Sequence, residues 1–174
     1  MKIQNIEKEI QILLNLFNAG KFDMVISKSK KLIRNSPDYL VLYNILGSSY
    51  QNFGELDLAK NIFIKGLKLD PTSIAIQNNL ANVYKNLGNI ELSEELFRKI
   101  IEEKPDYINA YINLGNLKRD NNDFKEAINL YNNALKINNK NPITLYSLAL
   151  AHQGLGNFNQ AIEFAKKTLQ YDPL

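Results

Sequence analysis

The chain has 174 residues and a formal net charge of only +3, from 21 basic and 18 acidic residues. It has no cysteine and one histidine, which excludes disulfides, thiolate ligands, a cysteine nucleophile and the usual multi-histidine metal sites. No segment is apolar enough for a signal peptide or a membrane span, so we expect a cytoplasmic protein with no membrane contact. Abundant Asn, Ile and Lys indicate a genome rich in A and T, which favours a bacterial source.

A period of 34 residues runs through almost the whole chain. Leucine recurs at Leu46, Leu80, Leu114 and Leu148, and the residue after it is small each time, as Gly47, Ala81, Gly115 and Ala149. An aromatic residue returns on the same grid at Phe63, Phe97 and Tyr131. A fixed period of this length indicates a stacked array of repeats rather than a single globular core. The repeats predicted in chain order are 6–39, 40–73, 74–107, 108–141 and 142–174.

Each repeat is expected to hold two amphipathic helices of about 13 residues. The turn between them needs a left-handed residue, which Gly accepts freely and Asn next best. The residues at this position are Gly20, Gly54, Gly88, Asn122 and Gly156. Proline ends most repeats, as Pro37, Pro71, Pro105 and Pro173, with Asn139 in the fourth and Pro142 starting the fifth.

The second repeat carries the pattern W-x2-L-G-x2-Y…A-x3-F…P, with Tyr in place of Trp. The matching residues are Tyr43, Leu46, Gly47, Tyr50, Ala59, Phe63 and Pro71. The chain therefore resembles the tetratricopeptide repeat (TPR) family. This resemblance implies an all-α superhelical solenoid of five helix-turn-helix repeats, ten helices in all, as one array over residues 1–174. The end repeats depart from the pattern, with Leu13 and Ser29 in the first and Ala165 in the fifth.

The chain stops directly after the last closing proline, without the polar capping helix that such arrays need. Ile162, Ala165 and Leu169 of the last helix are then expected to be only partly covered. We expect either that this is the N-terminal part of a longer protein or that copies associate as a homo-oligomer through the uncapped C-terminal end.

The sequence contains no catalytic constellation, so we expect neither an enzyme nor a bound metal or cofactor in this chain. His152 takes the position of Tyr50 and Tyr84 in the repeat, which favours a packing role. The pairs Glu94-Glu95 and Glu102-Glu103 are expected to be solvated charges on second helices. Four cations on the second helix of the first repeat, Lys28, Lys30, Lys31 and Arg34, are interpreted as a solvated outer face rather than a nucleic-acid patch.

In the family that the chain resembles, the first helices line a concave face that holds peptides. Asn is enriched at the positions concerned, and a carboxamide can pair with the C=O and N–H of an extended peptide whatever its side chains are. The predicted groove residues are Asn44, Asn78, Asn79, Asn82, Lys85, Asn109, Asn113, Asn116 and Arg119. Lys85 and Arg119 are the two that could meet an acidic group of the ligand.

The central repeats are also similar to those of the O-linked N-acetylglucosamine transferase, whose Asn ladder grips peptide backbones. The resemblance implies that Asn79 and Asn113 do likewise. In the outer repeats the same position holds Gln11, Ile45 and Ser147, so the predicted ladder is short.

Three functions remain open on this basis. The first is a scaffold that binds a protein or peptide segment in an Asn-lined groove. The second is the N-terminal interaction region of a larger transferase-type enzyme, a sulfotransferase or a glycosyltransferase. The third is a self-assembly module.

Overall fold

The computed structural model describes residues 2–172, with the backbone alone for residues 2–5. Within that range it contains ten α-helices and no strand, as the sequence predicts. Pro173, which the 34-residue grid includes, lies outside the described residues. Each predicted repeat contains two helices.

The first helices of the five repeats are α1 (Lys2–Asn18), α3 (Leu40–Asn52), α5 (Ile74–Asn86), α7 (Ile108–Asp120) and α9 (Pro142–Gly154). The second helices are α2 (Phe22–Asn35), α4 (Leu56–Leu69), α6 (Ile90–Glu103), α8 (Phe124–Ile137) and α10 (Phe158–Tyr171). Apart from α1, the first helices have 13 residues and the second helices 14.

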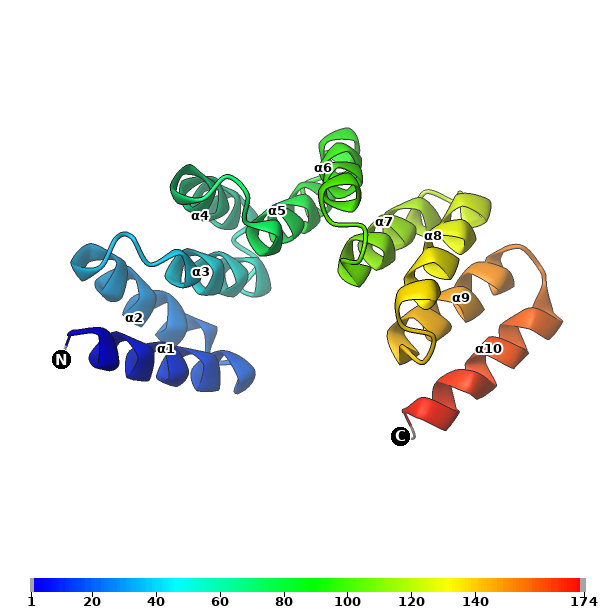
Figure 1. Cartoon of the computed structure of the whole chain (residues 1–174), viewed down its shortest axis with the longest axis horizontal. Helices are drawn as coiled ribbons and strands as arrows, with labels where there is room; N and C mark the ends of the chain where they lie inside the picture. Colours follow the sequence, from blue (N-terminus) through cyan, green and yellow to red (C-terminus); the bar gives the residue numbers. More distant parts are fainter. Residues whose placement is uncertain (1, 173–174) are drawn as a thin grey trace. The chain divides into compact units, whose positions relative to one another are not determined.

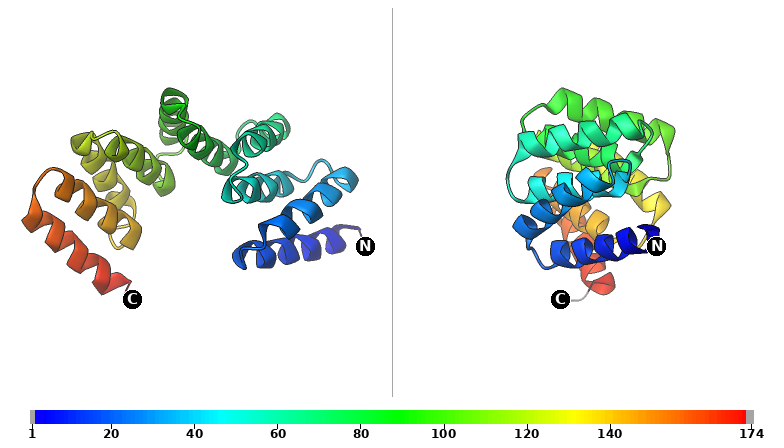
Figure 2. Two further views of the ribbon diagram at one scale, coloured as in Figure 1. Left: turned by 180° about the vertical axis from the view of Figure 1, so that it is seen from behind. Right: turned by 90° about the vertical axis from the view of Figure 1, so that its left-hand side faces the viewer.

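The helices form two compact units, one ending at Asn89 and the other beginning at Ile90. In the first unit α3 packs against α1, α2, α4 and α5 (Figure 1). In the second unit α7 packs against α6, α8 and α9, and α10 packs on α9 (Figure 2). Within each unit, consecutive first helices touch one another, which is the contact that a ladder of side chains requires.

The turns inside the repeats have the predicted backbone. Gly20, Gly54, Gly88 and Gly156 have φ between +69° and +88°, and Asn122 has φ +63°. The amide N–H of Asn122 donates to the Arg119 carbonyl at 2.9 Å, which closes the end of α7. Asn therefore replaces Gly where the left-handed conformation is required, because its short polar side chain tolerates that conformation better than most.

The glycine in the middle of α3 and the one in the middle of α7 make room for an aromatic ring. A Cβ atom added at Gly47 would lie 2.7 Å from Phe63 Cδ1, and one added at Gly115 would lie 2.8 Å from Tyr131 Cδ1. Both rings are completely buried. The contact between small residue and ring holds the two helices of a repeat together.

The first repeat reverses this arrangement. Leu13 stands in the position of the small residue and Ser29 in that of the ring, and both side chains are completely buried. Large and small residues have exchanged places, so the repeat keeps a filled interior. In this repeat the larger Leu13 therefore compensates for the smaller Ser29, although both depart from the family pattern.

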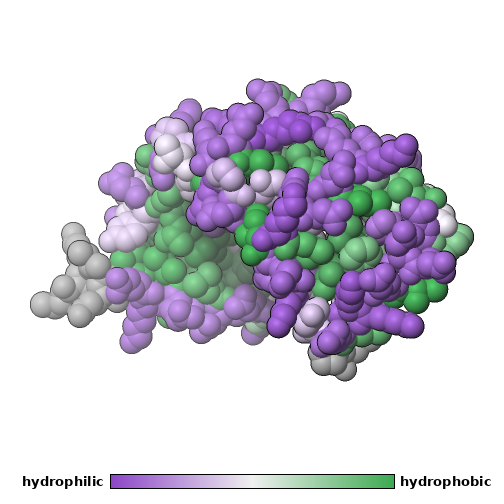
Figure 3. Space-filling model, turned by 45° about the vertical axis from the view of Figure 1, so that its right-hand side comes forward, coloured by the Kyte–Doolittle hydropathy of each residue, from purple (hydrophilic) through white to green (hydrophobic). Residues whose placement is uncertain are grey.

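The last repeat covers its second helix poorly. No residue of α10 is buried, and Ile162 and Leu169 are 54% and 53% exposed. On the face shown in Figure 3, hydrophilic side chains predominate, with apolar ones visible between them. The predicted exposure of the α10 residues is confirmed.

Candidate functional site: an amide surface on the first helices

The predicted groove residues come from three first helices. Asn44 lies on α3, and Asn78, Asn79, Asn82 and Lys85 lie on α5, all in the first unit. The second unit contributes residues of α7 alone: Asn109, Asn113, Asn116 and Arg119.

Side chains of α3 and α5 meet directly in the first unit. The Asn79 amide Nδ2 donates a hydrogen bond to Asn44 Oδ1 at 2.8 Å and approaches Ser48 Oγ at 3.4 Å. Both Asn side chains are partly exposed. Amides of two consecutive repeats thus form one surface, although Asn79 and Asn44 are not at identical positions of the repeat.

These bonds use only part of the amide groups. A carboxamide has one acceptor oxygen and two N–H donors. The Asn44–Asn79 bond leaves the Asn44 N–H groups and Asn79 Oδ1 out of the contact. One turn further along α5, Asn82 Nδ2 donates to the Asn78 carbonyl at 3.1 Å, which leaves Asn82 Oδ1 outside that bond.

Asn78 is more buried than the other predicted groove residues of this unit. Asn78 is only 6% exposed, so its side chain belongs to the packed part of α5. Lys85 lies at the end of α5 and is partly exposed. The polar groups that a ligand could reach on this unit are therefore the side chains of Asn44, Ser48, Asn79 and Asn82, with Lys85 partly exposed at the end of the helix.

On the second unit, Asn109 is exposed at the start of α7 and Asn113 is partly exposed one turn later. Asn116 Oδ1 accepts a hydrogen bond from the Tyr131 hydroxyl at 2.8 Å. Burial raises the pKa of Tyr131 to about 12, so the phenol stays a donor at neutral pH. The bond fixes the orientation of the Asn116 amide and directs its NH₂ group away from Tyr131.

Arg119 ends this row of residues. Its guanidinium bonds the Asp120 carboxylate at 2.9 Å. An acidic ligand group would therefore have to compete with Asp120 for Arg119. The predicted groove residues of α7 thus offer neutral amide donors and acceptors, with one cation, Arg119, that is already paired.

The described residues contain no group of three His, Cys, Asp or Glu that could hold a metal ion. Over the same range, no helix has the length and apolar character that crossing a membrane requires. The His152 ring stacks on Phe164 with centroids 5.4 Å apart, and its buried Nδ1 has no hydrogen-bond partner. Burial lowers the pKa of His152, as expected for a packing residue.

The prediction that Glu94 is a solvated charge is wrong. Its carboxylate lies 2.8 Å from Lys118 Nζ on α7 and 2.8 Å from an Arg98 nitrogen. The same two cations bond Glu126 of α8, at 3.1 Å from Lys118 and 2.5 Å from Arg98. Two carboxylates and two cations thus join α6, α7 and α8 into one ion-pair network.

The pKa values follow from this network. Burial acts to raise the pKa of Glu94, but hydrogen bonds from Lys118 and Arg98 outweigh it and the pKa is lowered. Burial acts to lower the pKa of Lys118, and bonds to Glu94 and Glu126 raise it overall. The network therefore keeps its ion pairs at neutral pH, where the carboxylates and the cations neutralise one another.

Comparison with known proteins comes from sequence patterns and from solved structures. The tetratricopeptide repeat pattern matches residues 40–73, 74–107 and 143–173, and a second TPR repeat pattern matches residues 115–156. No curated protein matches the chain.

Several solved structures share its fold. A structure of MamA from Desulfovibrio magneticus RS-1 matches with a TM-score of 0.75 at 16% identity. The match covers 95% of this chain and 94% of the MamA chain. PilF of Pseudomonas aeruginosa has a TM-score of 0.82 at 16% identity, covering 97% of this chain and 77% of its own. A protein described as a thermophilic TPR protein of Thermus thermophilus reaches 0.85 at 15% identity, covering 96% of this chain and 91% of its own. Identities this low show the fold alone.

Proposed function

Since this chain belongs to the tetratricopeptide repeat family, whose members typically serve as scaffolds for protein–protein interaction, we propose that it binds an extended peptide segment of a partner protein on the amide surface of its first helices. The amide surface of the first unit is formed by Asn44, Ser48, Asn79 and Asn82, and that of the second unit by Asn109, Asn113 and Asn116. We also propose that these amides bind the peptide backbone as the Asn ladder of the O-linked N-acetylglucosamine transferase does.

The observation that supports the proposal most strongly is the bond from Asn79 to Asn44. It brings the amides of α3 and α5 within 2.8 Å of one another, on a surface that is still partly exposed. A peptide lying across the two helices would meet consecutive donors and acceptors. The bond also orients both amides before any ligand arrives, so less side-chain entropy is lost on binding.

An uncharged surface of this kind recognises the peptide backbone rather than particular side chains. Each hydrogen bond contributes a net of about 0.5–1.5 kcal/mol, so binding depends on several bonds made in a row. The amides of α3 and α5 in the first unit would supply such a row. Sequence preference would then come from the side chains that border the amides.

The test begins with a random twelve-residue peptide library displayed on phage and selected on the whole chain. A selected peptide is synthesised and titrated calorimetrically against the wild type and against Asn79→Ala with Asn113→Ala. We expect the double variant to bind roughly five to one hundred times more weakly, since it loses about two hydrogen bonds. Both side chains are partly exposed, so the variant should keep its helical circular dichroism spectrum.

The matched control is Asn61→Ala with Asn129→Ala. These exposed Asn residues lie at equivalent positions on the second helices α4 and α8. The control should bind the peptide as tightly as the wild type. If both double variants bind equally well, the amides of the first helices do not hold the peptide and the proposal is refuted.

A further inference from the structure

A second surface of the first unit has a different chemistry. It follows α2 and α4, the second helices of the first two repeats. The α2 helix carries Lys28, Lys30, Lys31 and Arg34 against a single carboxylate, Asp23. The α4 helix carries Lys60, Lys65 and Lys68 against Asp57, and Lys60 pairs with that Asp at 2.6 Å.

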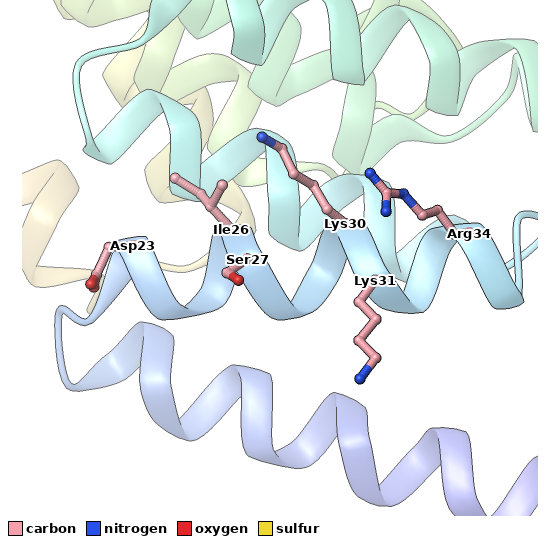
Figure 4. Close-up of a pocket in the computed structure, with 6 residues that line it drawn as sticks. All are labelled: Asp23, Ile26, Ser27, Lys30, Lys31 and Arg34. Atoms are coloured by element: carbon pink, nitrogen blue, oxygen red, sulfur yellow. The ribbon is translucent and has the colours of Figure 1, made fainter.

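Two adjoining cavities open on this side. One, of about 550 Å³, runs along α2 and is lined by Asp23, Ile26, Ser27, Lys30, Lys31 and Arg34 (Figure 4). The other, of about 280 Å³, is lined by Lys30, Ile33 and Arg34 of α2, Tyr43 and Leu46 of α3, and Ile62 and Lys65 of α4. Figure 4 shows Lys30 and Arg34, which line both cavities, leaving α2 on one side, and Lys31 on the other, toward α1.

We call the second cavity and its cations Lys30, Arg34 and Lys65 the basic groove. Its interior is apolar, from Ile33, Tyr43, Leu46 and Ile62, and its rim is positive. Among the residues that the structure describes, none of the three cations forms an ion pair. Lys30 Nζ instead lies 5.3 Å from the Tyr50 ring centroid, a cation–π contact.

The second unit shows what these positions look like when the charges are satisfied internally. Two periods along the chain, Lys30 corresponds to Arg98, which pairs with Glu94 and Glu126. In the first unit the positions of Glu94 and Glu126 hold Ile26 and Leu58. The first unit therefore keeps one cation of the network, at Lys30, and has apolar residues in place of both carboxylates.

We propose that the basic groove binds an acidic peptide segment of another protein, in which an apolar side chain is flanked by carboxylates. The apolar side chain would enter between Ile33 and Ile62. Its flanking carboxylates would pair with Lys30, Arg34 and Lys65, which form no ion pair with any other described residue. A guanidinium can hold a carboxylate through two parallel hydrogen bonds, which makes Arg34 the strongest single contact.

This site is independent of the amide surface. Two positions along an α-helix correspond to a rotation of about 200°, so Leu46 faces away from both Asn44 and Ser48 on α3. The groove is also poorly suited to nucleic acid. Only three cations border it, and Tyr43 is just 8% exposed, so it cannot stack on a base.

The probe for the test is the synthetic peptide Asp-Asp-Glu-Leu-Phe-Glu-Glu-Asp, labelled with fluorescein and followed by anisotropy with the whole chain. We expect Lys30→Glu with Arg34→Glu to weaken binding at least roughly tenfold, because charge reversal turns attraction into repulsion. Lys30→Ala with Arg34→Ala should weaken it less. Both residues are exposed, and circular dichroism verifies that the variants fold.

The matched control is Lys21→Glu with Lys28→Glu, which makes the same charge change at two exposed lysines that line neither cavity. It should weaken binding less than about twofold. A second probe peptide, with Ser in place of Leu and Phe, should bind roughly fivefold or more weakly than the first if the apolar interior takes part.

Three outcomes would overturn the proposal. The first is equal weakening by the control and by the charge reversal, which would mean attraction to net charge alone. The second is tighter binding of a single-stranded oligothymidylate of equal charge than of the peptide, which would assign the groove to nucleic acid. The third is self-association at low salt that only Lys30→Glu with Arg34→Glu abolishes while peptide binding is unchanged, which would make a second copy the occupant.

Discussion

The contact between Gly47 and the Phe63 ring allows a quantitative test of how each repeat is held together. We consider Gly47→Ala, Phe63→Ala and the double variant. Phe63 is completely buried, and removing such a ring costs about 3–5 kcal/mol of unfolding free energy. The ring lies where the methyl group added by Gly47→Ala would have to go, since that Cβ would be 2.7 Å from Phe63 Cδ1 and Cζ.

Two opposing effects determine the result for Gly47→Ala alone. Overpacking against the ring costs about 1–3 kcal/mol, and the higher helix propensity of Ala returns about 1 kcal/mol. The net loss is then about 0–2 kcal/mol. Once Phe63 is replaced by Ala, the clash disappears, and the same Gly47→Ala change should stabilise the protein by about 1 kcal/mol.

The coupling energy between the two positions is therefore expected to be about 1–3 kcal/mol. Urea denaturation followed by circular dichroism at the helical band gives the unfolding free energies of the wild type, the two single variants and the double variant. Gly54→Ala is the control, because its φ of +88° penalises Ala while no atom lies within 4 Å of the added Cβ. Gly54→Ala should lower the unfolding free energy by about 1–2 kcal/mol both in the wild type and in the Phe63→Ala variant. Additive effects of Gly47→Ala and Phe63→Ala would refute the close contact.

Three further predictions concern other parts of the chain. Leu80→Ala should cost about 2–5 kcal/mol in urea denaturation, because the side chain is only 4% exposed, and a loss below about 1 kcal/mol would contradict its core position. The pKa of Glu94 is lowered in the folded state, so its contribution is complete above the ordinary pKa of about 4.5 and is lost as the pH falls through the folded-state value. Glu94→Gln should therefore flatten the loss of stability in the acid range, and an unchanged pH profile would contradict the ion-pair network. The pKa of His152 is also lowered, but the folded state favours its neutral form, so stability should fall as the pH drops below about 6.5. His152→Phe should remove that step in thermal melts between about pH 7 and pH 5, and a step of unchanged size would assign it to other groups.

Much of the fold could be predicted because it depends on local rules that repeat. The left-handed residue at the turn must be Gly or its nearest substitute, so Asn122 could be recognised from its position alone. The 34-residue period likewise identifies Leu80 and Ala81 as buried. Each of these features depends on residues within one helix pair, and the same residue types recur at the same positions in several repeats.

The features that could not be predicted depend on which helix faces meet. Glu94, Arg98, Lys118 and Glu126 come from three helices, and nothing in the spacing of their charges along the chain indicates a network. The bond between Tyr131 and Asn116 is similar, since it needs the tilt of α8 on α7. In the first repeat, Leu13 and Ser29 seemed a loss of pattern because an exchange of sizes is visible only when both are known to be buried.

The most direct test of binding by the amide surface is a nuclear magnetic resonance titration that follows the side-chain NH₂ groups of Asn. The whole chain, labelled with ¹⁵N, is titrated with a peptide selected from the phage library. We expect the NH₂ signals of Asn44, Asn79 and Asn113 to shift with peptide concentration, while those of Asn61 and Asn129 stay in place. Shifts confined to Asn61, Asn129 and their surroundings, with the first three unmoved, would contradict it.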